Sequence, residues 1–192
     1  MKRVQRLYRE EKSKLFSQKQ TEQLSGFSRE QMRKLDEKQI VVSQKHPVIL
    51  YSWKQVIFLK TLFHFREDLT WGQIEESLNN CEYNVQEIID GIQETVMVAI
   101  GEVENKKLVF INKVESKMND FDKHRGKKLM NIDSEMISEA FKVINAPDEN
   151  NIIFATVKRK FNAVIITIPQ IIIELKKTAE ELEIENFELK VG

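Results

Sequence analysis

The chain has 192 residues, a length that corresponds to one domain or two small ones. Charged residues make up 31% and apolar residues 41% of the sequence, which predicts a globular chain with a well-solvated surface rather than a disordered one. The single cysteine, Cys81, excludes a disulfide framework and a cysteine-rich zinc site. No apolar run approaches the roughly 20 residues of a membrane span, and no signal-peptide pattern follows the charged N-terminus. We therefore expect a cytoplasmic protein with no membrane segment.

The net charge is zero, but it is spread unevenly along the chain. Residues 1–60 carry a balance of +8, residues 61–125 a balance of −6 and residues 126–192 a balance of −2. A surface that meets phosphate groups needs cations, so the N-terminal third is where such a surface is expected. A basic tail beside an ordinary solvated face is the alternative interpretation.

Four helix starts are predicted by a repeated capping-box pattern, in which a Ser or Thr is followed three residues later by a Gln. The hydroxyl accepts a hydrogen bond from a backbone N–H, and the Gln side chain binds the N–H of the cap residue in return. The four boxes are Ser17–Gln20, Ser28–Gln31, Ser52–Gln55 and Thr70–Gln73.

The first two predicted helices, 17–24 and 28–38, are separated by Gly26, which tolerates the left-handed conformation that ends a helix. Two helices joined by so short a turn form a helix-turn-helix unit. The predicted core of this unit is Leu24, Phe27, Met32 and Leu35. Residues 40–51 then predict a hairpin, and residues 52–66 and 70–78 predict a third and a fourth helix.

This order resembles the winged helix-turn-helix DNA-binding domain of the MerR family of bacterial transcription regulators. The resemblance covers residues 15–79 and is carried by the turn at Gly26-Phe27-Ser28, by Tyr51-Ser52 at the end of the wing, and by Val56 and Leu59 in the third helix. A turn containing Arg66 precedes the fourth helix, in which Ile74 follows.

The resemblance implies that the chain binds double-stranded DNA as a homodimer through the second helix and the wing. Arg29, Gln31 and Arg33 would meet the major groove, Lys34 and Lys45 the DNA backbone, and Tyr51 would position the wing. The implied DNA-binding residues are Ser28, Arg29, Gln31, Arg33, Lys34, Lys45 and Tyr51. The chain departs from the family at Val48-Ile49-Leu50, where the family has a wing Gly and Arg, and at Gln39, where it has a glycine that ends the second helix.

The C-terminal half predicts a small α+β module. Residues 85–96 predict a helix of about three turns, whose apolar face serves equally as an intramolecular core or as a dimer seam. Strands are predicted at 97–100, 108–114, 152–157 and 163–168, a loop at 116–128, a turn at 147–151, and helices at 134–144 and 169–182.

The predicted fold class is therefore α+β, with a basic segment at 1–14, a MerR-like domain at 15–83 and a module at 84–192 for dimerisation or for binding a partner or effector. The sequence contains no catalytic constellation, phosphate loop or metal-ligand spacing, so we predict a transcription regulator that is not an enzyme and has no cofactor. The alternative is a protein-interaction adaptor or antitoxin-like partner that keeps the helix-turn-helix as a scaffold.

Overall fold

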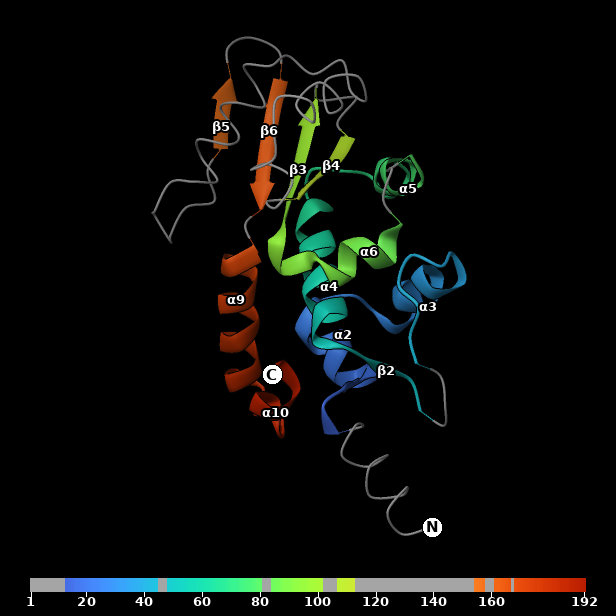
Figure 1. Cartoon of the computed structure of the whole chain (residues 1–192), viewed down its shortest axis with the longest axis vertical. Helices are drawn as coiled ribbons and strands as arrows, with labels where there is room; N and C mark the ends of the chain where they lie inside the picture. Colours follow the sequence, from blue (N-terminus) through green and yellow to red (C-terminus); the bar gives the residue numbers. More distant parts are fainter. Residues whose placement is uncertain are drawn as a thin grey trace. The chain divides into compact units, whose positions relative to one another are not determined.

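The structure is a computed structural model. It describes residues 13–44, 48–80, 84–101, 107–112, 154–157, 161–166 and 168–192. Helices and two antiparallel sheets make up these residues, which confirms the predicted α+β class (Figure 1). The chain divides into two compact units, one of residues 1–63 with 171–192 and one of residues 64–170.

The first two helices of the N-terminal unit begin at the predicted capping boxes. Helix α2 spans Gln18–Ser25 and helix α3 spans Arg29–Glu37. Ser17 Oγ accepts a hydrogen bond from the Gln20 N–H at 3.3 Å, and Gln20 Oε1 accepts one from the Ser17 N–H at 3.0 Å. Because both partners of the box lie within one turn, local sequence alone sets where the helix starts.

The turn between α2 and α3 requires a glycine. Gly26 has a φ of +85°, and its N–H donates to the Glu22 carbonyl at 3.0 Å. A Cβ at this position would lie 2.9 Å from the Phe63 ring. The predicted tight turn at Gly26 is confirmed, and any side chain there would meet both backbone strain and the ring.

The predicted core of the helix pair is confirmed, because Leu24, Phe27, Met32 and Leu35 are each at most 2% exposed. Helix α4, Trp53–Phe65, packs into the same core. The Ser52–Gln55 box begins this helix, with hydrogen bonds of 2.9 and 3.2 Å. Its apolar residues are buried on several faces: Val56, Ile57, Phe58, Leu59 and Leu62.

The predicted hairpin at residues 40–51 is wrong in its extent. Strand β2, Leu50–Tyr51, pairs antiparallel with strand β1, Phe16–Ser17, which the sequence analysis did not anticipate. Within the described part of 40–51, a single bridge between Gln44 and Leu50 remains, with two hydrogen bonds of 3.0 Å.

Ile40 and Val41 end α3 instead of forming a strand. Both of their N–H groups point back to the Leu35 carbonyl, and both side chains are buried. The bond from Ile40 to Leu35 closes the helix end in the manner of a Schellman motif, with Gln39 in the left-handed conformation at a φ of +57°. Gln39 thus adopts the conformation that glycine accepts more readily.

The C-terminal residues 171–192 complete the N-terminal unit. Helix α9 spans Ile168–Glu181, which confirms the predicted last helix, and helix α10 spans Phe187–Val191 and was not predicted. The Phe187 ring centroid lies 6.0 Å from that of Phe16 and 5.6 Å from that of Trp53. Lys190 Nζ donates to the Leu15 carbonyl at 2.7 Å and to Gln20 Oε1 at 3.3 Å.

The second unit contains helix α5, Trp71–Asn79, capped by Thr70 as predicted, and an antiparallel sheet in the order β4-β3-β6-β5. Two pairs of predicted strands are confirmed with shifted bounds: β3 Thr95–Gly101 with β4 Lys107–Asn112, and β5 Phe154–Val157 with β6 Phe161–Ile166. The Leu108 N–H donates to Ser77 Oγ at 2.9 Å, which ties α5 to β4.

The helix predicted at 85–96 is too long. Helix α6 spans only Val85–Asp90, the 3₁₀ helix η1 spans Ile92–Glu94, and β3 begins at Thr95. Gly91 caps α6, and the pairing of Val96 with Ile111 draws the next residues into the sheet, so tertiary pairing overrides the helical period.

The remaining sequence predictions lie outside the described residues: the segment 1–14 apart from its last two residues, Lys45, the loop at 116–128, the helix at 134–144 and the turn at 147–151. The two units divide the chain after residue 63 and after residue 170, so the predicted domain 15–83 contributes to both, and residues 171–192 pack with the N-terminal helices. The boundary at 83 stays a prediction. Among the helices in the described ranges, none combines the length and the apolar character needed to cross a bilayer.

Candidate nucleic-acid interface

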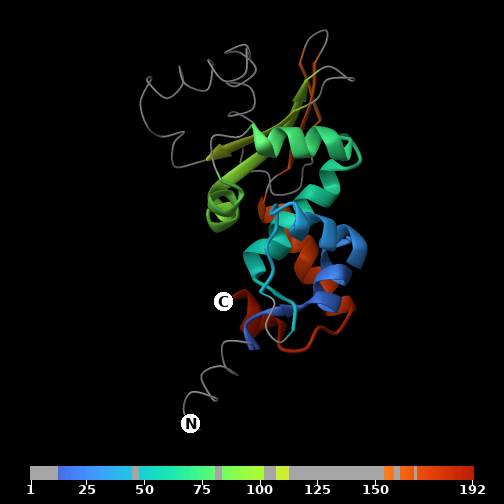
Figure 2. The same cartoon turned by 90° about the vertical axis from the view of Figure 1, so that its right-hand side faces the viewer.

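Helix α3 presents one charged face and one apolar face. Met32 and Leu35 point into the core, whereas Arg29, Arg33 and Lys34 are exposed. Figure 2 views the molecule from the side on which α3 lies, and in Figure 1 α9 and α10 lie on the other side of the N-terminal unit. The three predicted cations of α3 therefore stand clear of the C-terminal helices of their own unit.

Two of these cations are held in ion pairs along the helix. Arg33 Nη1 lies 2.7 Å from Glu37 Oε1, and Lys34 Nζ lies 3.3 Å from Glu30 Oε1. Both pairs join residues four apart, the spacing that places side chains side by side on a helix surface. All four side chains are more than half exposed, between 55% and 69%, so each pair is open to solvent and to a ligand.

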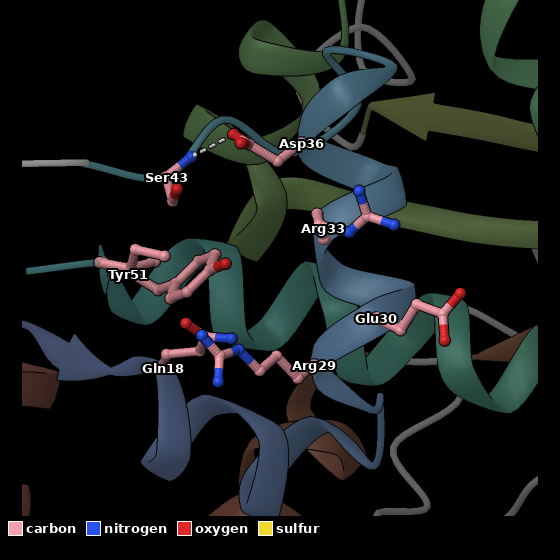
Figure 3. Close-up of a pocket in the computed structure, with 8 residues that line it drawn as sticks. Gln18, Arg29, Glu30, Arg33, Asp36, Ser43 and Tyr51 are labelled. Atoms are coloured by element: carbon pink, nitrogen blue, oxygen red, sulfur yellow. Dashed lines mark hydrogen bonds between the residues drawn. The ribbon is translucent and has the colours of Figure 1, made fainter.

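Arg29 differs from the other two cations. It is the first residue of α3, it is exposed, and it forms no hydrogen bond or ion pair with any residue in the described ranges. In Figure 3 its side chain leaves α3 and extends toward Gln18 at the start of α2. A guanidinium without a hydrogen bond or an ion pair can bind a phosphate without first breaking an interaction within the protein.

Ser28 and Gln31 are used in the cap of α3. Gln31 Oε1 accepts from the Ser28 N–H at 2.8 Å, and Ser28 Oγ accepts from the Gln31 N–H at 3.4 Å. The predicted capping box is therefore present. The Ser28 N–H occupies the Gln31 oxygen, which is therefore not available to accept a hydrogen bond from a base edge. In this geometry Gln31 stabilises the start of α3.

A hollow of about 350 Å³ opens between α3, the first turn of α2 and β2 (Figure 3). It brings together two of the predicted DNA-binding cations and the predicted wing tyrosine. It also contains two carboxylates, so the hollow has no net charge of its own. Its lining residues are Gln18, Arg29, Glu30, Arg33, Asp36, Ser43, Ile49 and Tyr51.

The floor of this hollow is held by bonds between segments distant in sequence. Asp36 is 9% exposed, and its carboxylate accepts a hydrogen bond from the Ser43 N–H at 3.2 Å. Gln55 Nε2 donates to the Val42 carbonyl at 2.7 Å, which fastens the same segment to α4. These two bonds hold residues 42–43 between α3 and α4.

Tyr51 is buried, only 3% exposed, and lies in β2 opposite Phe16. Burial raises the pKa of its phenol, and the hydrogen bond with the Ser43 side chain offsets this only in part, while the charge of Asp36 adds to the rise. The phenol is therefore neutral over the whole physiological range. Its place is consistent with a residue that positions β2 rather than one that reaches far into solvent.

Sequence reasoning missed Gln18, Asp36 and Ser43 as parts of this site. Gln18 lay at the start of a predicted helix, and nothing in its neighbourhood marks it as facing α3. Asp36 follows Leu35 on the buried side of α3, and a buried carboxylate requires a hydrogen-bond donor or a cation nearby. This requirement could have marked Asp36 as part of a site. The donor, the Ser43 N–H, is seven residues away and is identified only by the fold.

No protein-family model and no curated protein matches this sequence. In the part of the chain that the structure describes, no cluster of three or more His, Cys, Asp or Glu side chains could hold a metal ion. The site is therefore characterised by its own geometry: a capped helix with exposed cations beside a hollow.

Proposed function

We propose that the chain is a DNA-binding transcription regulator that meets duplex DNA with α3 and the segment leading to β2. The observation that carries this proposal is Arg29, which is exposed on α3, unpaired within the described residues and part of the lining of the hollow, beside the exposed Arg33 and Lys34. Phosphate contacts supply most of the affinity of such proteins, and these contacts come from exposed Arg and Lys side chains.

The local geometry supports a helix that can enter a groove. The capping box leaves α3 with a well-defined start, and its buried residues fix it to α2 and α4. The positive end of a helix also favours nearby phosphate, so the first turn around Arg29 is the part of α3 best suited to a backbone contact. MerR-like identity and a dimeric state remain part of this proposal, on the resemblance stated above.

The test is a titration of the full chain with a random-sequence duplex at two salt concentrations. We expect binding that weakens steeply with salt. Arg29→Ala should weaken it and lower the slope of log K against log salt by about one unit, because one phosphate contact is lost. Arg33→Ala should weaken it less, because Arg33 is already paired with Glu37.

Lys177→Ala is the matched control. Lys177 is 76% exposed and lies on α9, away from α3. Its replacement by Ala removes one positive charge from the same unit, as Arg29→Ala does. Equal effects of Arg29→Ala and Lys177→Ala, or no binding by the wild-type chain, would contradict the proposal.

A second candidate, a protein-interaction adaptor, is favoured by one observation. Val42, Val48 and Ile49 are 44%, 51% and 36% exposed, so three aliphatic side chains face solvent close to β2. Exposed apolar groups of this kind suit a protein partner better than a phosphate backbone. If the chain is such an adaptor, its binding to the partner protein should be almost insensitive to salt. The duplex titration would then show no DNA binding that depends on Arg29.

A further inference from the structure

The two carboxylates on the outer face of α3 set a limit on how that helix can hold DNA. Three exposed cations, Arg29, Arg33 and Lys34, share this face with Glu30 and Glu37. A helix designed only for affinity to phosphate would lack these acids, because each of them repels the DNA backbone and attracts a cation that could otherwise contact it.

The geometry of α3 connects each acid to one particular cation. Arg33 donates to Glu37 at 2.7 Å, a short charge-assisted hydrogen bond, whereas Lys34 and Glu30 are 3.3 Å apart. The Arg33–Glu37 pair is thus the closer of the two. Arg29, with no such partner in the described ranges, could contact DNA without giving up an existing bond.

We propose that Glu37, and secondarily Glu30, restrain sequence-independent DNA binding by holding Arg33 and Lys34 within α3. This inference rests on the proposed function and adds to it a role for the two acids. For Arg33 to contact a phosphate it must leave Glu37, which costs the modest free energy of an exposed ion pair and leaves an unpaired carboxylate near the DNA backbone, so Arg33 gains less from the contact than an unpaired cation would. A groove that also satisfies the displaced carboxylate, for example through a cytosine amino group, makes the exchange more favourable.

The test compares Glu37→Gln with the wild-type chain on a random-sequence duplex. We expect tighter binding, with the slope of log K against log salt steeper by about 0.9, because the released Arg33 reaches one more phosphate. The advantage over wild type should consequently fall by roughly three- to fourfold between about 50 and about 200 mM salt. Glu30→Gln should shift binding in the same direction by less.

Glu181→Gln is the matched control, because Glu181 forms an exposed pair of the same four-residue spacing with Lys177 on α9, at 3.9 Å. It changes the net charge equally, so it reports the effect of charge alone. A double-mutant cycle then isolates the pair: in the Arg33→Ala background, Glu37→Gln should lose most of its effect.

The outcomes separate this inference from the proposed function. If the wild-type chain binds DNA through Arg29 but Glu37→Gln behaves like Glu181→Gln, the inference that Glu37 restrains DNA binding is wrong. The proposal of a DNA-binding regulator then stands. If Glu37→Gln tightens binding equally with and without Arg33, Glu37 acts only by repulsion and the pairing is wrong. If no variant binds DNA, both proposals fail together.

Discussion

The turn between α2 and α3 depends on the absence of a side chain at Gly26. The residue has a φ of +85°, and the Phe63 ring lies directly over the place where a Cβ would stand. This single position therefore couples the geometry of the helix pair to the packing of α4. Sequence alone indicated the left-handed turn, whereas the contact with Phe63 became known only from the fold.

Gly26→Ala should lower the free energy of unfolding by about 1–3 kcal/mol, through left-handed strain and the displaced ring together. Urea denaturation measures this. Gly72→Ala is the control, because Gly72 lies in α5 with nothing within 4 Å of its would-be Cβ. That change should be neutral or stabilise by up to about 1 kcal/mol, since alanine is the better helix former. Equal losses at the two glycines would show that neither the left-handed strain nor the Phe63 contact at Gly26 matters.

Capping boxes are the local device that builds the helices. All four boxes predicted from the sequence are present, at α2, α3, α4 and α5. A fifth box, which begins α6, was not predicted because Asn84 and Glu87 stand in place of Ser or Thr and Gln. A capping box needs only two residues three positions apart, so tertiary contacts have little influence on it. Helix starts were therefore predicted more accurately than helix ends, as the early end of α6 shows.

Ser28→Ala should destabilise the chain by about 1 kcal/mol, because the Gln31 N–H loses its acceptor at the start of α3. Ser28→Asn keeps a capping oxygen and should restore stability. If Ser28 acts only as a cap, Ser28→Asn should also bind the random duplex as the wild-type chain does. A variant of full stability but weak DNA binding would instead assign Ser28 a direct contact with DNA.

On the scale of the whole molecule, residues from the two ends of the chain form one unit. Phe187 packs edge-on to Phe16 and Trp53, and Lys190 lies 5.3 Å from the centroid of the Phe16 ring while it binds the Leu15 carbonyl. Lys60 and Glu174 add an ion pair of 2.8 Å in which Lys60 is only 12% exposed. The C-terminal helices are consequently expected to stabilise the helix pair that carries the candidate interface.

Phe187→Ala should lower the free energy of unfolding by about 1–3 kcal/mol, because two aromatic contacts and part of their buried area are lost together. Leu189→Ala in the same helix is the control, since Leu189 is 61% exposed, and it should change stability by less than about 0.5 kcal/mol. Urea denaturation measures this, followed by tryptophan fluorescence, to which Trp53 beside Phe187 and Trp71 in the second unit both contribute. Identical unfolding of the two variants would mean that α10 does not support the N-terminal unit.

The sequence by itself determined the features that depend on neighbours within one helical turn or one strand: the capping boxes, the glycine turn, the core stripe from Leu24 to Leu35, and the strands of the second unit. Only the tertiary structure decided the pairing of Phe16 with Tyr51, the bond between Asp36 and Ser43, and the docking of α10. The physical reason is separation along the chain. Lys190 and Leu15 are 175 residues apart, and no local propensity or periodicity encodes a contact across that distance.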